Sequence, residues 1–281
     1  MPITLKNVEY VYAKSTPFEK KALDNINLQV KEGEFLTILG KTGSGKSTLI
    51  QLMNGVIKPT IGEVRVDGLS TNEKSDSVFD IRRKVGIVFQ YPEHQFFEEN
   101  VLKEISFGPM NFGMDETRIK ELVVSSIKMV GLDPEVLFAS PFSLSGGEKR
   151  KVAIASIIAC DPKYLIFDEP TSGLDPISVK RFSLLAKKLQ SVGKTVVVVT
   201  HSVEFALKNS DRIIVLSNGK IVFEVTKEHF KDPLKLEEIE RYDLLLPDIY
   251  KLTKNTLNMN FSNKKLDEPL SFLRTFLSVK S

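Results

Sequence analysis

The sequence predicts an α/β fold built on a parallel β-sheet, with a helical insert and a small helical appendage near the C-terminus. Three observations indicate it: short apolar runs that end in polar residues, a glycine-rich loop between one such run and a helix, and helical spacing near the middle of the chain. Apolar runs of this kind are typical of parallel strands that are covered on both faces. The strands expected in the sheet are Phe35–Leu39, Val85–Phe89, Tyr164–Phe167 and Thr195–Thr200.

The first 70 residues indicate short strands separated by turns. Besides Phe35–Leu39, strands are expected at Ile3–Tyr12, Ile26–Val30 and Glu63–Val66, with glycines between them. The segment Ser47–Met53 has helix-forming residues and no helix breaker. The local order around the glycine-rich loop is therefore strand, loop, helix.

Helical spacing dominates between about residues 97 and 160. Apolar side chains recur at helical intervals in Ile119–Val130 and Lys149–Ile158, and the pair Gly108-Pro109 is expected to end an earlier helix. Two amphipathic segments, Leu234–Leu252 and Leu266–Val279, predict the appendage. We therefore divide the chain into a core domain of residues 1–230, with a helical subdomain at about residues 91–162, and a C-terminal extension of residues 231–281.

The composition is that of an ordinary globular protein. Of 281 residues, 42% are apolar and 27% are charged, and 39 basic and 36 acidic side chains give a net charge of +3. This charge is too small to favour nucleic acid as a partner. The longest uncharged apolar runs, Val152–Cys160 and Thr195–Thr200, are far shorter than the roughly 20 residues of a membrane span. Because the start resembles no secretory signal and Cys160 is the only cysteine, we expect the protein inside the cell.

The glycine-rich loop after Phe35–Leu39 predicts a phosphate-binding site. Its glycines allow successive backbone N–H groups and the next helix N-terminus to point at phosphate oxygens. Lys46 is expected to reach the β- and γ-phosphates of ATP, and Ser47 to bind Mg²⁺. The alternative is an ordinary glycine-rich turn. The residues that match the P-loop pattern are Gly40, Lys41, Thr42, Gly43, Ser44, Gly45, Lys46, Ser47 and Thr48.

Two carboxylates at the end of Tyr164–Phe167 predict a second part of this site. In a P-loop protein the first carboxylate after such a strand binds Mg²⁺, so Asp168 is the expected metal ligand. Because side chains alternate along a strand, Glu169 should point elsewhere, toward the γ-phosphate side where an attacking water could lie. Glu169 is therefore the candidate general base. The alternative is a strand that merely ends in two solvated acids.

Further motifs follow one another in the order found in ABC ATPases, and residues 3–225 resemble that family. Taken singly, a Gln or a His at a strand end is more often structural, so the interpretation depends on the ordered set. The matching segments are the signature Leu144–Glu148, the D-loop Ser172–Asp175, the Q-loop residue Gln90, the switch histidine His201 and the adenine-stacking aromatic Tyr12.

The resemblance implies an ATPase that binds ATP and Mg²⁺, with Lys46, Glu169 and His201 as catalytic residues. Gln90 would contact Mg²⁺ and the nucleotide, and Tyr12 would stack on adenine. The signature and the D-loop would add nucleotide contacts from Ser145, Gly146, Gly147, Glu148 and Asp175. Glu148 stands where Gln is commoner in the family, a polar exchange that should leave the glycine cradle intact.

The signature also has a physical interpretation. Two glycines beside Ser145, followed by a helix that begins near Glu148, would make a second cradle of backbone N–H groups. In the family, two protomers pack head to tail, so that the P-loop of one and the signature of the other enclose each ATP. The resemblance therefore implies a dimer with a second ATPase subunit, which could be identical or different.

The residues after Gln90 narrow the resemblance to one branch of the family. The runs Phe89–Phe96 and Ile105–Gly113 are similar to the ATPases of energy-coupling factor (ECF) transporters and of related cobalt and nickel importers, and Asp243–Ile249 is similar to the extension through which ECF ATPases dimerise. The resemblance implies a peripheral subunit at the cytoplasmic face of the membrane. Its partners would be a transmembrane coupling protein and, through it, a substrate-capture membrane protein for vitamins or transition-metal ions.

Two alternatives stay open: the ATPase of another ABC importer, and a soluble ABC ATPase that has no part in transport. The sequence favours transport, because it has neither a second ATPase cassette nor a long coiled coil nor a basic tail. Phe96 and Phe97, beside a proline turn, could equally belong to the core or to a docking patch for a membrane partner.

Overall fold

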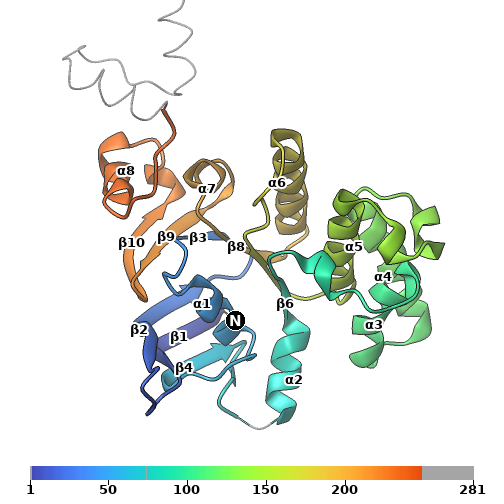
Figure 1. Ribbon diagram of the computed structural model, residues 1–281, viewed down its shortest axis with the longest axis horizontal. Helices are drawn as coiled ribbons and strands as arrows, with labels where there is room; N and C mark the ends of the chain where they lie inside the picture. The colour runs from blue at the N-terminus through green and yellow to red at the C-terminus, as the bar shows by residue number, and fades with distance from the viewer. Residues whose placement is uncertain (1, 74, 249–281) are drawn as a thin grey trace, which may run out of the picture.

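A six-stranded β-sheet forms the centre of the computed structural model, which describes residues 2–73 and 75–248 (Figure 1). Its edge strand β10 is antiparallel to β9, and the other strands run parallel. All the strands expected in the parallel sheet are found there, so the α/β fold class is confirmed. The sequence analysis did not identify β9 and β10. The order across the sheet is β10 (Lys220–Thr226), β9 (Arg212–Ser217), β3 (Phe35–Leu39), β8 (Thr195–Thr200), β7 (Tyr164–Asp168) and β6 (Val85–Val88).

A second, antiparallel sheet lies beside the first. Its strand β2 begins before the expected start at Ile26, and this boundary was wrong. Asn25 has a positive φ of 52°, and the pairing of β2 with β1 shifts register repeatedly. These irregularities break the alternation of apolar and polar side chains by which a strand is predicted. The strands follow the order β2 (Lys20–Val30), β1 (Ile3–Tyr12), β4 (Ile61–Val66) and β5 (Leu69–Ser70).

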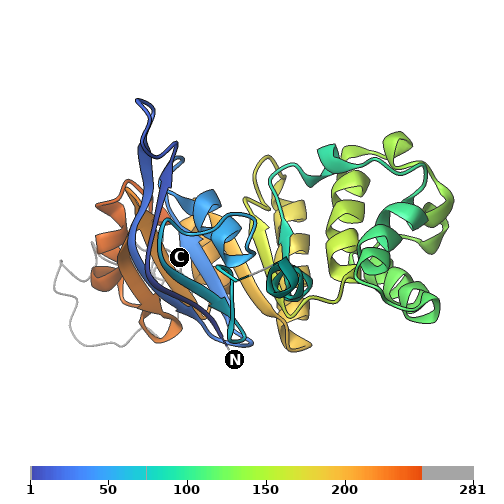
Figure 2. The same cartoon turned by 90° about the horizontal axis from the view of Figure 1, so that it is seen from below.

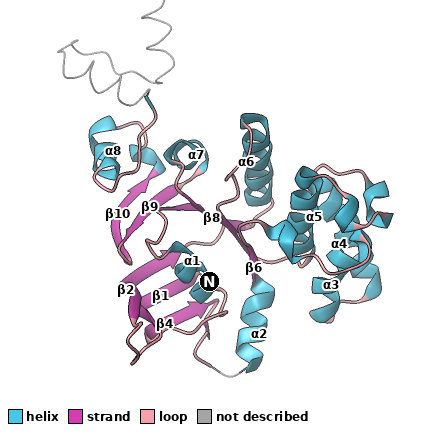
Figure 3. Cartoon of the chain, in the orientation of Figure 1, coloured by secondary structure: helices cyan, strands magenta, loops and turns pink. Residues whose placement is uncertain are grey.

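Helices lie beside the strands of the central sheet (Figure 3). Neighbouring side chains of β8 pack in two different clusters of the core. Val197 and Val199 pack in one cluster with residues of the antiparallel sheet and of helix α1. Val196 and Val198 pack in another cluster, with residues of α6 and α7. Burial on both faces explains why the parallel strands are continuous apolar runs. The helices on these layers are α1 (Lys46–Met53), α6 (Pro176–Ser191) and α7 (Val203–Asn209), and α2 (Ser75–Lys84) leads into β6.

The remaining core helices gather at the side of the molecule away from the antiparallel sheet (Figure 2). The pair Gly108-Pro109 lies inside α3, where we expected a break. Pro109 has no N–H group to donate to the Ile105 carbonyl oxygen, yet α3 continues to Asn111, so the expected break at this pair was wrong. The helices of this group are α3 (Val101–Asn111), α4 (Glu116–Met129) and α5 (Gly146–Ala159).

Short 3₁₀ turns connect several of these elements: η1 (Pro92–Gln95), η2 (Pro134–Phe138), η3 (Pro141–Ser143) and η4 (Lys227–His229). Within residues 2–73 and 75–248, no helix combines the length and the apolar character needed to cross a membrane.

The C-terminal extension begins with the short helix α8 (Pro233–Glu240), which packs against β9 and β10. A helix over Leu234–Leu252 was expected, and this was wrong: α8 ends at Glu240, and the chain turns at Asp243, where φ is 57°. Two buried leucines after the turn return to the same apolar cluster, and this packing ends the helix early. The second expected segment, Leu266–Val279, lies outside the described residues. The domain boundaries drawn from the sequence stay predictions.

Asp67 connects the two sheets. This residue is in the turn between β4 and β5, and its carboxylate accepts hydrogen bonds from the Tyr164 hydroxyl (2.7 Å) and from Lys163 Nζ (3.1 Å). Lys84 Nζ lies 3.5 Å from the same carboxylate. Burial alone would raise the pKa of Asp67, but these bonds and charges outweigh it, so the pKa is lowered. The antiparallel sheet is thereby attached to β7, the strand that ends at Asp168.

Cys160 caps the C-terminal end of α5. Its thiol donates a hydrogen bond to the carbonyl oxygen of Ser156 at 3.4 Å. Burial raises the pKa of this thiol to about 12. The side chain is therefore protonated at neutral pH and a poor nucleophile.

Candidate active site

A cleft of about 550 Å³ lies where β3, β7 and β8 end. Open α/β sheets bind their ligands at this carboxyl edge. Gly40, Lys41 and Ser44 belong to the loop at the cleft without being part of its lining. The residues proposed from the sequence that line the cleft are Tyr12, Thr42, Gly43, Gly45, Lys46, Ser47, Thr48, Gln90, Asp168, Glu169 and His201.

The loop from Gly40 to Gly45 leads into the N-terminus of α1. Gly45 has a φ of 107°, and a Cβ atom there would come within 2.7 Å of the Ala22 carbonyl oxygen, so only glycine fits. Helix α1 has no side-chain cap and no acidic residue in its first turn. Its first N–H groups are therefore available to an anion such as phosphate.

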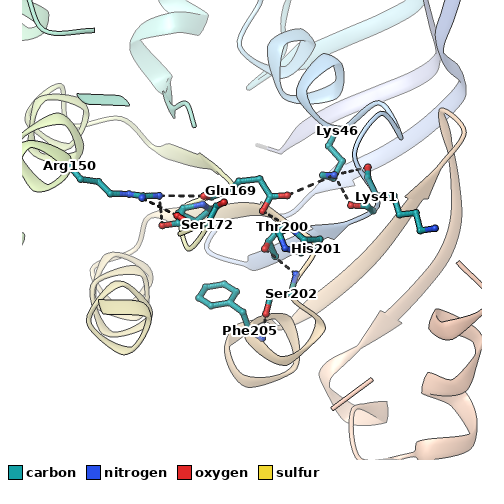
Figure 4. Close-up of polar contacts among 11 residues, drawn as sticks. Lys41, Lys46, Arg150, Glu169, Ser172, Thr200, His201, Ser202 and Phe205 are labelled. Carbon is teal, nitrogen blue, oxygen red and sulfur yellow. Dashed lines mark hydrogen bonds and ion pairs between the residues drawn. The ribbon is translucent and has the colours of Figure 1, made fainter. Parts of the chain in front are cut away.

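Lys46 is 8% exposed and folds back on its own loop (Figure 4). Its Nζ atom donates hydrogen bonds to the carbonyl oxygens of Gly40 (2.6 Å) and Lys41 (2.9 Å), and Glu169 Oε1 lies 3.9 Å away. Burial lowers the pKa of Lys46, against the opposing charges of Glu169 and Asp168. The ammonium group is thus held beside the loop that would bind phosphate.

Ser47 and Asp168 form the part of the cleft that suits Mg²⁺. The Ser47 hydroxyl donates a hydrogen bond to Asp168 Oδ2 at 3.1 Å. Burial raises the pKa of Asp168, and the bond from Ser47 works in the opposite direction. Gln90 brings an amide to the same cleft. Hydroxyl, carboxylate and amide oxygens are hard ligands of the kind that Mg²⁺ binds, so the residues fit this ion.

The backbone conformation sets the direction of the Glu169 side chain. We expected the alternation of side chains along the strand to point Glu169 away from Asp168. Instead, β7 ends at Asp168, and a positive φ of 47° at Glu169 sets the direction of its side chain. This left-handed conformation is stabilised by a hydrogen bond from the Glu169 N–H group to the Val199 carbonyl oxygen at 2.8 Å. Glu169 Oε2 then lies 3.1 Å from Nδ1 of His201 (Figure 4).

His201 follows β8, and its side chain is 66% exposed toward the cleft mouth. The next residue, Ser202, fixes the chain at this point. Its N–H group donates to Thr200 Oγ1 at 3.2 Å, and its Oγ atom accepts from the Phe205 N–H group at 3.2 Å as the cap of α7. The imidazole is therefore presented from a well-defined strand-to-helix junction.

Tyr12 ends β1 at the rim of the cleft and is 40% exposed. Its hydroxyl is hydrogen-bonded to Thr48 Oγ1 at 3.0 Å, and its ring packs edge to face on Tyr10 with centroids 4.7 Å apart. Both contacts orient the ring, and its exposure at the rim makes it accessible to a planar ligand.

The signature residues lie outside this cleft. Ser145 and Glu148 form a capping box at the start of α5: Ser145 Oγ accepts from the Glu148 N–H group, and Glu148 Oε2 accepts from the Ser145 N–H group at 3.0 Å. The Ser145 hydroxyl also donates a hydrogen bond to Glu148 Oε2 at 2.6 Å, and this bond together with the one from the Ser145 N–H group lowers the pKa of Glu148. Gly146 and Gly147 are exposed and have open space around them. A glutamate at this position therefore stabilises the helix start and leaves the glycine cradle open.

Asp175, from the D-loop, is the N-cap of α6. Its Oδ1 atom accepts hydrogen bonds from the N–H groups of Ile177 (2.9 Å) and Ser178 (3.0 Å). The side chain of Ser178 bonds the other oxygen, and these contacts lower the pKa of Asp175. The residue is exposed and does not line the cleft in this single chain.

Lys41 connects the loop to the C-terminal extension. Its Nζ atom lies 2.7 Å from Asp243 Oδ2, although 202 residues separate the two positions. Both side chains are exposed, so this ion pair contributes little stability. It does place the turn after α8 next to the phosphate loop.

Sequence reasoning missed several residues of the site, among them Lys20, Lys21 and Ala22, which line the cleft. Asn218 and Gly219, at the tip of the β9–β10 hairpin, line the cleft, and the Gly219 N–H group donates to the Ser44 carbonyl oxygen at 3.0 Å. Their Asn-Gly pair, a strong hairpin signal, could have been found. Arg150 holds the backbone that follows β7. No local pattern indicates this role, because it depends on how α5 packs.

The chain matches the family described as ABC transporter over residues 23–172. It is 46% identical over 268 residues to the energy-coupling factor transporter ATP-binding protein EcfA2 of Clostridium perfringens, and the aligned residues cover 93% of this chain and 92% of that protein. It is 40% identical over 279 residues to the protein of the same name from Streptococcus pyogenes serotype M5, covering 99% of both.

Solved structures of similar proteins share the fold. A dimeric ATP-binding cassette in a post-hydrolysis state, bound to ADP and Pi, gives a TM-score of 0.72 and is 37% identical, covering 80% of this chain and 98% of that chain. The structure of cbiO1 from Clostridium perfringens, part of the ABC transporter complex cbiONQ, gives a TM-score of 0.75 at 33% identity, covering 90% of this chain and 98% of that chain.

Proposed function

From the membership of this chain in the ABC transporter family, among the ATP-binding subunits of energy-coupling factor transporters, we propose how its residues bind and hydrolyse ATP. The chain is an ATPase that powers an ECF-type transporter. One observation carries the proposal: Lys46, Glu169 and His201 come from three separate elements and meet in one cleft, with Glu169 Oε2 3.1 Å from His201 Nδ1.

The phosphate loop and Tyr12 bind the nucleotide. Backbone N–H groups of the loop and of the first turn of α1 donate hydrogen bonds to the phosphate oxygens, and the oriented ring of Tyr12 stacks on adenine. Ser47, Asp168 and Gln90 would hold Mg²⁺, which supplies positive charge against the phosphate oxygens. Support for this arrangement comes from the uncapped helix start and from the hard oxygen ligands beside it.

Glu169 acts as the general base. Its carboxylate accepts a proton from a water molecule, the water oxygen bonds to the γ-phosphorus, and the bond from that phosphorus to the bridging oxygen of ADP breaks. His201 holds the carboxylate through Nδ1 and contacts the γ-phosphate. Lys46 stabilises the negative charge on the phosphate oxygens.

A second ATPase subunit completes each site. The signature cradle and Asp175 lie outside the cleft that Lys46 lines, so one chain supplies two separate half-sites. We place the signature and Asp175 of one subunit against the nucleotide of its partner, in a head-to-tail dimer of identical or different chains. A similar solved cassette, described as dimeric, supports this arrangement.

The proposed dimer works at the cytoplasmic face of the membrane, beneath a transmembrane coupling protein. Through that protein it serves a substrate-capture membrane protein for a vitamin or a transition-metal ion. Phe97 supports docking near η1, because it is 58% exposed and packs edge to face on the partly exposed Phe107. Its neighbour Phe96 packs against the core. Of the two aromatics, we therefore assign the core role to Phe96 and the docking role to Phe97.

The variant Glu169→Gln tests the general base. It keeps the size of the side chain and removes its ability to accept the proton, so phosphate release should fall by roughly a hundredfold or more. ATP affinity should stay unchanged, and a closed dimer should accumulate with ATP. Equilibrium binding, phosphate release and light scattering measure the three quantities. Glu204→Gln, which makes the same charge change on the exposed surface of α7, is the control. Normal phosphate release by Glu169→Gln would refute the proposal.

A further inference from the structure

Lys41, the second residue of the phosphate loop, is held from two sides. Its carbonyl oxygen accepts a hydrogen bond from Lys46 Nζ at 2.9 Å. Its side chain extends away from Lys46 (Figure 4), and its own Nζ atom lies 2.7 Å from Asp243 Oδ2. The backbone of Lys41 therefore contacts the lysine that we assign to the phosphates, while its ammonium group reaches the C-terminal extension.

The turn that carries Asp243 has an anchor of its own. Leu244 and Leu246, which follow Asp243, are buried and belong to the same apolar cluster as Leu39. Leu39 ends β3 and directly precedes the phosphate loop. The turn is thus fixed on the core beside the start of the loop, independently of the ion pair. From this fixed position its carboxylate can hold Lys41 in place.

The phosphate loop depends on such contacts for its shape. Gly43 and Gly45 have φ angles of 82° and 107°, and glycine adopts many other conformations with similar ease. A loop that adopts its binding conformation for only part of the time binds its ligand more weakly by that fraction. An exposed ion pair such as Lys41–Asp243 changes such an equilibrium by up to about fivefold. This effect is too small to hold the fold together, but it is large enough to change an affinity measurably.

We propose that Asp243 is a positioning residue for ATP binding: its carboxylate holds the Lys41 side chain on the outside of the phosphate loop, and so makes the ATP affinity of the loop depend on the C-terminal extension. This inference rests on the role proposed above for the phosphate loop. By reciprocity, ATP in the cleft favours the conformation in which the pair is formed, and so stabilises the turn after α8. The extension then regulates the nucleotide site, because anything that moves the turn changes how tightly the chain binds ATP.

Asp243→Asn, in the full-length chain, tests the proposal by calorimetric titration with ATP under conditions without turnover. The loss of the pair should raise the Kd for ATP about two- to fivefold. Simple attraction between charges predicts the opposite, because removing an acidic group near the phosphate loop favours an anion. Asp243→Glu, which keeps the charge, should recover part of the affinity. Glu228→Gln is the control, because Glu228 is an exposed acidic residue in η4, directly before the extension.

Three further measurements separate positioning from a general structural defect. Salt at about 1 M screens an exposed ion pair, so the Kd of Asp243→Asn should then approach that of the natural chain in the same salt. The kcat of the assembled transporter at saturating ATP should be unchanged in Asp243→Asn, because the pair does not contact Glu169. Lys41→Gln should also raise the Kd, and the double variant should bind ATP about as weakly as Lys41→Gln alone, because the pair is already lost there.

Hydrogen exchange tests the reciprocal effect in the natural chain. In the turn after α8, the N–H groups of Arg241 and Tyr242 bond to the carbonyl oxygens of Glu238 and Ile239 at 3.2 and 3.1 Å. Saturating ATP should slow the exchange of these two amides, because ATP favours the paired conformation. The same amides should show no response to ATP in Asp243→Asn.

Three results would overturn the inference. The first is a Kd for ATP in Asp243→Asn equal to or lower than that of Glu228→Gln. The second is a raised Kd that persists in about 1 M salt beside a lowered melting temperature, which indicates a merely structural role. If Asp243→Asn fails to fold, the absence of any response of the two turn amides to ATP in the natural chain is the third.

Lys46→Ala, measured in parallel, separates the two proposals. Unchanged ATP binding in that variant contradicts the phosphate loop as the binding site. Weakened binding in Lys46→Ala beside normal binding in Asp243→Asn contradicts this inference alone.

Discussion

Burial lowers the pKa of Lys46, and the neighbours of this residue compensate for part of the lost water. Two carbonyl oxygens accept its hydrogen bonds, and Glu169 Oε1 lies 3.9 Å away. A charge held in a place with little water attracts phosphate more strongly than one in bulk solvent. The same contacts fix the position of the ammonium group beside the phosphate loop.

Replacing this residue, Lys46→Ala, should therefore weaken equilibrium ATP binding by roughly ten- to a hundredfold, the loss expected for a hydrogen bond to a charged group. Calorimetric titration under conditions without turnover measures it. Lys58→Ala removes an exposed lysine outside the cleft and should leave the affinity unchanged. Unchanged binding in Lys46→Ala would show that the phosphates lie elsewhere.

The sequence predicted which residues line the cleft better than it predicted how they are held. Lys46, Asp168 and Glu169 are recognised by spacing, because short local patterns build the loop and the strand end. The direction of Glu169 depends on a left-handed φ and on a bond to β8, and the spacing contains neither. The bonds from Arg150 to the backbone that follows β7 arise only in the folded chain, because Arg150 belongs to α5.

The β9–β10 hairpin is the element that supports the phosphate loop from outside. The N–H group of Gly219 donates to Ser44, and its carbonyl oxygen accepts from Asp24 at 2.9 Å. Gly219 has a φ of 75°, and a Cβ atom there would lie 2.6 Å from the Ala22 carbonyl oxygen. Pattern alone did not identify these strands, because what defines β9 is its pairing with the distant β3.

Gly219→Ala should therefore change two properties at once. The positive φ should lower the free energy of unfolding by roughly 1 kcal/mol. The contact with Ala22 should also displace the phosphate loop and weaken ATP binding. Gly193→Ala is the matched control, since Gly193 has a φ of 87° with nothing near its Cβ position. Urea denaturation and ATP titration should show a stability loss in both variants but an affinity loss only in Gly219→Ala. Equal affinities would mean that the hairpin does not support the loop.

On the scale of the whole molecule, the two sheets are tied together at Asp67. Its partners Lys163 and Tyr164 lie at the start of β7, and Lys84 lies at the end of α2. The chain therefore attaches its antiparallel sheet directly to the strand that ends at Asp168. The fold class was predictable because apolar runs imply a parallel sheet, but this attachment was not, because it joins residues nearly a hundred positions apart.

Asp67→Asn should lower the free energy of unfolding by about 1–3 kcal/mol at neutral pH, because it removes the charge that these partners bind. The folded-state pKa of Asp67 is lowered, so its contribution is present above the unfolded-state pKa of about 4 and is lost as the pH falls through the folded-state value. The stability difference from the natural chain should therefore shrink in acid. Denaturation curves at neutral pH and at about pH 3 measure this, with exposed Asp80→Asn as control. A difference that is the same in acid would contradict the role of the charge.

The protonated thiol of Cys160 makes the chain suitable for selective labelling at an introduced cysteine. With its pKa raised to about 12 and no second cysteine in the sequence, the natural chain should resist maleimide reagents at neutral pH. A cysteine introduced at Leu245, which is 76% exposed in the turn beside the phosphate loop, would then take up a fluorescent dye selectively. Because Cys160 should not react, the fluorescence of this dye would report changes at the turn beside the phosphate loop when ATP is added.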